Sequence, residues 1–174
     1  MVRPIEHLIV ALFPVAGYFY LRDRRLLSLE LAAVTFLGSQ FPDLIDKPLA
    51  LQLNLIPTGR VFMHSLPVAV PVWALVIAYS WKTDRLRAGA AFVFAYASHL
   101  VADNHQTLLA GRMPNDLLWP LVAPTPRPPI PYWAGPESIN VHLFTLFSVT
   151  VLSVTAYYCV RDVFEQFRGD SDLE

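Results

Sequence analysis

Five apolar segments, separated by short charged links or by proline-rich loops, organise this chain of 174 residues. They lie near residues 8–21, 26–38, 66–81, 86–102 and 141–160. Segments 66–81 and 86–102 lack the polar stripe that a surface helix of a soluble protein carries. Only 141–160 has the roughly 20 residues that cross a bilayer unaided, so the others need polar ends, tilt or a locally thinner bilayer. The pattern predicts an all-α, integral membrane helical bundle of about five spans.

Composition agrees with this interpretation. Hydrophobic residues make up 55% and charged residues 16% of the chain, and the mean hydropathy is +0.43, which is above the usual range of soluble domains. A soluble helical bundle with an unusually apolar core is the alternative. The length suits one domain, which we place at residues 1–168, followed by a disordered acidic tail at 169–174. The formal net charge of −1 gives no reason to expect a nucleic-acid partner. The single cysteine, Cys159, excludes a disulfide within the chain and a cysteine-based zinc site.

The distribution of basic residues predicts an orientation in the membrane. The links at 22–25 and 82–87 hold six of the 13 Lys and Arg residues, and Arg161 and Arg168 follow the last segment. The other five are spread over much longer loops. The positive-inside rule places the dense side in the cytoplasm. We therefore expect a cell-membrane protein with its N-terminus outside and its C-terminus inside.

Six ionisable side chains stand at the ends of these segments, and the predicted topology puts all of them on the non-cytoplasmic face. They are His7, Asp43, Asp46, His64, His99 and Asp103. Imidazoles and carboxylates close to hydrocarbon are costly unless they pair or bind an ion. We expect them to form one shared metal site.

The pair His99 and Asp103 has the clearest spacing. A separation of four places both on one helical face, which suits two ligands of one ion or of adjacent ions. In the alternative, His99 caps the helix and Asp103 solvates its end.

Asp43 and Asp46 follow Gly38 and Pro42. We expect the helix to break after the second segment and a short helix to start at Pro42, which would direct both carboxylates one way. Helix capping by Asp43 is the alternative. Carboxylates mixed with imidazoles suit zinc, manganese or iron better than calcium or magnesium.

Arg60 precedes His64 by four residues, so the two share a face if 60–65 is helical. A guanidinium beside a metal-binding histidine is suited to holding a phosphate, because its planar fork matches phosphate oxygens. Alternatively, Arg60 only anchors the chain at the level of the lipid head groups.

Taken in order, these motifs resemble a known family, the membrane-associated metal-dependent hydrolases of the LexA-binding inner-membrane protein type. The resemblance covers about residues 1–122. The matching residues are His7, Gly38-Ser39-Gln40-Phe41-Pro42-Asp43 with Asp46, Arg60 with His64-Ser65, His99 with Asp103, and Leu118-Trp119-Pro120. The family is similar at a distance to zinc-dependent phospholipase C and to fungal single-strand nucleases, which use clustered metal ions to cleave phosphoesters.

The resemblance implies a membrane-embedded metal-dependent hydrolase that acts on a lipid or lipid-linked phosphoester. One or two divalent ions, zinc first among them, would activate a water molecule. Asp46 is then both a candidate ligand and the candidate base, and Arg60 would hold the phosphate. Two other classes stay open. One is a non-catalytic regulator or scaffold with a closed structural metal site, and the other is a transporter, which needs polar groups at mid-membrane.

Overall fold

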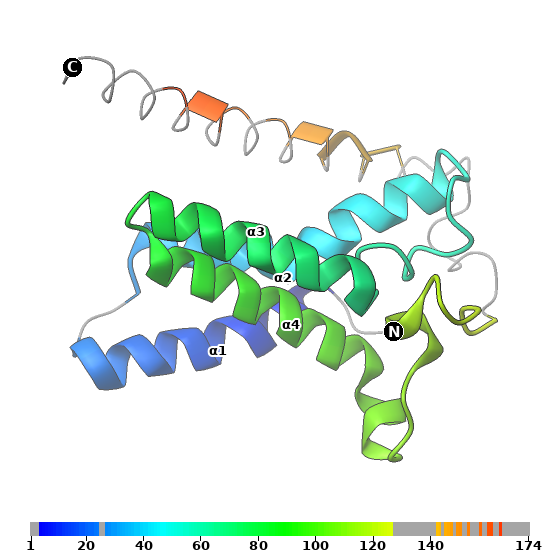
Figure 1. Ribbon diagram of the computed structural model, residues 1–174. Coiled ribbons are helices and arrows are strands. Elements are labelled where there is room, and N and C mark those ends of the chain that lie inside the picture. The colour runs from blue at the N-terminus through cyan, green and yellow to red at the C-terminus, as the bar shows by residue number, and fades with distance from the viewer. Residues whose placement is uncertain are drawn as a thin grey trace.

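The computed structural model describes residues 4–24 and 27–126, together with scattered positions between 142 and 164. Within these residues all regular structure is helical, which confirms the all-α prediction for this part of the chain (Figure 1). The elements are α1 (Pro4–Asp23), α2 (Leu29–Leu51), α3 (Leu66–Lys82), α4 (Leu86–Leu109) and the short 3-10 helix η1 (Asn115–Leu118). Apart from those scattered positions, the predicted fifth segment at 141–160 lies outside the described residues, as does the acidic tail.

Helix α4 lies at the centre of the bundle and contacts α1, α2 and α3, with its most extensive contact to α2. Its inward side chains Phe92, Tyr96 and Leu100 form the main apolar core together with Ala69 of α3 and Leu117 of η1. Because α4 touches each of the other long helices, side chains near its C-terminal end can meet groups from every one of them.

Helix α2 differs from the prediction, because it continues without a break through Gly38, Pro42 and Pro48. The predicted break after the second segment is therefore wrong. Each internal proline removes one helical hydrogen bond, but packing against α4 offsets that loss. Gly38 supports this packing and does not end the helix, since a Cβ there would lie 2.5 Å from the carbonyl oxygen of Phe92.

The helix considered for residues 60–65 is absent. Residues 52–65 form turns and bends, and α3 begins at Leu66 after the buried N-cap Ser65. Arg60 and His64 are thus positioned by an irregular loop and not by a shared helical face.

Within the described residues, no helix combines the length and the apolar character needed to cross a membrane.

The close approach of α2 and α4 makes a testable prediction at Gly38. The variant Gly38→Ala should lower the free energy of unfolding by roughly 1–3 kcal/mol, because the added methyl group meets the backbone of α4 and forces the helices apart. Thermal unfolding of the detergent-purified protein, followed by circular dichroism, measures the effect. Gly17→Ala is the matched control, since a Cβ at that position meets nothing within 4 Å. Equal stability of the two variants would contradict this account of the contact.

Candidate metal centre

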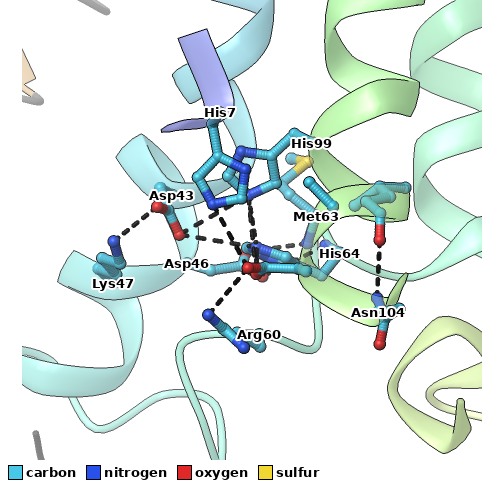
Figure 2. Close-up of polar contacts among 12 residues, drawn as sticks. His7, Asp43, Asp46, Lys47, Arg60, Met63, His64, His99 and Asn104 are labelled. Atoms are coloured by element: carbon cyan, nitrogen blue, oxygen red, sulfur yellow. Dashed lines mark hydrogen bonds and ion pairs between the residues drawn. The ribbon is translucent and has the colours of Figure 1, made fainter. Parts of the chain in front are cut away.

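The structure brings together all six side chains that the sequence analysis selected. Figure 2 labels His7, Asp43, Asp46, His64 and His99 among them. They come from the first turns of α1, the second half of α2, the loop before α3 and the C-terminal half of α4. All are almost completely buried, with an exposed fraction of 4% or less for five of the residues and 2% for the side chain of Asp103. Such a concentration of buried ionisable groups requires either strong pairing or a bound ion.

Two imidazoles form the middle of the cluster, with 3.1 Å between the Nε2 atoms of His64 and His99. The Nδ1 of His99 lies 2.6 Å from the carbonyl oxygen of Ser39, which can only accept a hydrogen bond, so this nitrogen carries the proton. The Nδ1 of His64 likewise donates to Asp46 Oδ2, at 2.8 Å. In the neutral imidazoles both Nε2 atoms therefore present lone pairs to each other. The two lone pairs repel each other unless a proton or a cation lies between the two nitrogens.

Two carboxylate oxygens flank this pair of nitrogens. Asp43 Oδ1 lies 3.6 Å from the Nε2 of His64 and 3.9 Å from the Nε2 of His99. Asp103 Oδ2 lies at the same two distances, 3.6 Å and 3.9 Å. Ligand atoms bound at about 2.0–2.2 Å around a tetrahedral ion lie about 3.3–3.6 Å from one another. Each carboxylate oxygen therefore completes, with the two nitrogens, a triangle that fits one cation.

The second oxygen of each carboxylate is held by a cation of the protein. Lys47 Nζ lies 2.6 Å from Asp43 Oδ2, and Arg60 Nη2 lies 2.9 Å from Asp103 Oδ1. Burial alone would raise the pKa of Asp43, but Lys47, through its charge and its hydrogen bond, and the two central imidazoles together bring that pKa below its usual value. Burial also opposes ionisation of Asp103, yet the contact with His7 and the charge of Arg60 bring its pKa well below the usual range. Both side chains are therefore negatively charged at neutral pH.

Asp46 lies against the loop that carries His64. The backbone N–H of Met63 donates to its Oδ1 at 2.8 Å, and the backbone N–H of His64 donates to its Oδ2 at 3.3 Å. With the bond to the His64 ring, both oxygens contact residues 63 and 64. A carboxylate that accepts a hydrogen bond from the Nδ1–H of a histidine fixes the orientation of the ring and makes the other nitrogen a better metal ligand. Carboxylates often support metal-binding histidines in this way.

His7 stacks on His99, with ring centroids 3.8 Å apart and 18° between the ring planes. Its Nε2 lies 3.3 Å from Asp103 Oδ1, while its buried Nδ1 has no hydrogen-bond partner in the described part of the chain. His7, His99 and Asp103 thus form one group that could hold an ion, and Asp43, His64 and His99 form another. The two groups share His99, whose single free nitrogen serves one ion at a time.

Sequence reasoning missed two contributors, Lys47 and the carbonyl group of Ser39. Lys47 was counted only as a loop cation, because α2 was expected to break before it. In a continuous helix, the four-residue spacing from Asp43 predicts the observed pair. The Ser39 carbonyl leaves no signal in the sequence, since any residue would supply it.

The other two histidines that the structure describes, and Trp119 of the Leu118-Trp119-Pro120 motif, lie outside this cluster. His105 is exposed, with its Nδ1 2.6 Å from the carbonyl oxygen of Ala102 on its own helix. His142 is also exposed and lies 3.4 Å from the side chain of Gln52. Trp119 packs edge-on against Phe62, at 6.3 Å between ring centroids.

Comparison with known proteins identifies the family. No curated protein and no solved structure gives a significant match to the chain, so the distant likeness to zinc-dependent phospholipase C gains no support. A family description does match almost the whole chain, and it agrees with the inner-membrane group that the motifs resemble. The chain belongs to the YdjM inner membrane protein family, which it matches over residues 1–162.

Proposed function

We propose that this protein is a membrane-embedded, metal-dependent hydrolase of phosphoesters, with its metal bound among the four helices. The observation that carries the proposal is the pair of facing Nε2 atoms of His64 and His99, 3.1 Å apart and flanked by ionised carboxylates. Each imidazole already donates its Nδ1 proton elsewhere, so the remaining lone pairs and negative charges converge on a position that suits a divalent cation.

The outer surface supports a membrane location beyond the family name. Large apolar side chains are exposed along the helices, including Phe13 and Leu21 of α1, Leu75 and Trp81 of α3, and Phe94 of α4. Water would disfavour so much apolar surface, whereas lipid would cover it. We propose that these helices, with segment 141–160, form the predicted bundle. In the predicted orientation the metal centre lies at the non-cytoplasmic end.

The proposed ligands are His64, His99, Asp43 and Asp103, and zinc suits this mixture of imidazole and carboxylate. When bound, a zinc ion would lower the pKa of a water molecule towards neutrality and would polarise a phosphoester. His7 stacks beside these ligands and offers, with His99 and Asp103, a second group for an alternative position of the same ion.

The chain's own groups supply the rest of the chemistry. Arg60 holds one oxygen of Asp103 and is 14% exposed, so its remaining N–H groups are available to a phosphate. Asp46, which the sequence indicated as the base, contacts residues 63 and 64 and is better suited to orienting His64. We assign proton transfer to Nδ1 of His7, which has no hydrogen-bond partner among the described residues.

The near-complete burial of the ligands also suits a second candidate function, a non-catalytic membrane protein with a closed structural metal site. The two candidate functions differ in whether a substrate can reach the metal ion.

The test is metal analysis of the detergent-purified protein, together with hydrolysis of bis(p-nitrophenyl) phosphate before and after chelation. We expect bound zinc, turnover that stops on chelation, and recovery when zinc is added back. Bound zinc without turnover of this or a lipid phosphoester would favour the structural site. Purified protein that neither retains nor rebinds a divalent metal would contradict both candidate functions.

The orienting role of Asp46 makes a separate prediction. The variant Asp46→Asn should weaken zinc binding by roughly 10- to 100-fold, because the His64 ring loses a charged partner while its Nε2 stays in place. Competition against a coloured chelator measures the affinity. Asp84→Asn, at an exposed position between α3 and α4, is the matched control. An unchanged affinity in Asp46→Asn would remove Asp46 from the site.

A further inference from the structure

A concave site lies between α1 and α4, at the end of the bundle opposite the candidate metal centre. It is a cavity of about 650 Å³, within the range of small-molecule binding sites. Its apolar walls are formed by Pro14, Val15, Phe19, Ala90, Ala91 and Phe94. None of these side chains takes part in the metal centre.

Two guanidinium groups stand at the mouth of this groove. Arg22 and Arg87 both line it, and their side chains are 56% and 63% exposed. Asp23 lies between them, with Oδ1 3.8 Å from Arg22 Nε and Oδ2 3.2 Å from Arg87 Nη1. One carboxylate between two guanidiniums leaves one positive charge uncompensated.

The position of Arg22 is fixed further by Tyr18, which also lines the groove. The guanidinium lies over the tyrosine ring, 5.8 Å from its centroid, and donates a hydrogen bond to the hydroxyl group. The result is an apolar channel with an anchored, fork-shaped cationic group at its entrance. This geometry matches a molecule with an acyl chain and a singly charged phosphate, and it matches neither a purely polar nor a purely apolar ligand.

We propose that the groove between α1 and α4 binds one phospholipid with an anionic head group. The acyl chain lies along Val15, Ala90 and Phe94, and the phosphate lies on Arg22 and Arg87. The surplus positive charge selects an anionic phospholipid over a zwitterionic one. Membership of an inner membrane family places such lipids within reach of the chain, and the proposal does not depend on the metal centre.

The test uses the detergent-purified, delipidated full chain. Native mass spectrometry and thermal unfolding are measured with added dioleoyl phosphatidylglycerol, dioleoyl phosphatidylcholine or inorganic phosphate. We expect one phosphatidylglycerol per chain, bound at least about tenfold more tightly than phosphatidylcholine. The double variant R22Q/R87Q should lose this preference, and Ala90→Trp should block both lipids by filling the groove. Lys82→Gln removes an exposed cation outside the groove and should behave as the wild type.

Circular dichroism of each variant checks that its helices are retained. For any variant whose mass spectrum is weak, the displacement of a bound fluorescent dye by the added lipid measures lipid binding instead. Equal binding of the two lipids, or phosphatidylglycerol binding unchanged in R22Q/R87Q, would overturn the proposal. The proposal would also be overturned if inorganic phosphate competed for the groove as well as phosphatidylglycerol does. A disulfide that forms between Ala90→Cys and the native Cys159 would show instead that the chain's own segment 141–160 fills the groove.

Discussion

Replacement of His99 by alanine is expected to remove the bound metal and abolish phosphoester hydrolysis. His99 belongs to both possible ligand groups, is completely buried, and has its ring fixed by the bond from Nδ1 to the Ser39 carbonyl. The metal content should fall from about one ion per chain to a small fraction of that, and turnover should fall to background. Metal analysis by mass spectrometry and the phosphodiester assay measure the two effects.

The control for this experiment is His105→Ala, at an exposed histidine six residues, or about 1.7 turns, further along the same helix. It should keep both metal and activity. Because His99→Ala also leaves a cavity in the centre, His99→Gln provides a variant of closer volume, and circular dichroism reports whether α4 is retained. A folded His99→Ala protein with wild-type zinc content would refute the ligand assignment.

Removal of the Arg60 guanidinium is expected to have the largest effect on stability. Arg60 and Asp103 form an ion pair in which the carboxylate is 2% exposed, so Arg60→Gln leaves a buried negative charge with a weaker partner. The free energy of unfolding of the metal-free protein should fall by roughly 2–5 kcal/mol. Added zinc should recover much of this loss, because a cation bound to Asp103 replaces the missing charge. Thermal unfolding in detergent, with chelator or with zinc, measures both the loss of stability and its recovery.

The double variant R60Q/D103N tests whether charge is the cause. Neutralising Asp103 together with Arg60 should restore most of the stability of the chelated protein, and zinc should stabilise this double variant less than it stabilises R60Q. Lys82→Gln, at an exposed position on α3, should change neither the stability of the chelated protein nor its response to zinc. If R60Q and R60Q/D103N were equally unstable, packing of the arginine stem and not its charge would explain the loss.

Much of the cluster could be predicted because its residues are marked by local rules. His99 and Asp103 are separated by one helical turn, and the structure places both on α4 with 3.9 Å between Nε2 and Oδ2. The starts of α3 and α4 were also predicted at Leu66 and Leu86, where apolar residues begin after a polar link. Periodicity and composition decide such features over a few neighbouring residues.

The errors arose where a distant contact overrides a local preference. Gly38 and Pro42 usually weaken a helix, and their positions predicted a break before the two aspartates. The backbone of α4 approaches Gly38 so closely that the missing side chain becomes the reason for the packing. The continued helix then brings Lys47 onto Asp43, a pair that the predicted break had hidden.

By itself, the sequence determined the helical class, the apolar character of the helices and the set of ionisable residues at one end of the bundle, because residue type and spacing specify these properties locally. Only the tertiary structure decided how the six residues divide their roles. Which histidine nitrogen is free, and which carboxylate oxygen faces it, depends on Ser39, Lys47, Arg60 and the loop at Met63. Those partners come from separate elements, so the chemistry of the centre exists only once α1, α2 and α4 have packed together.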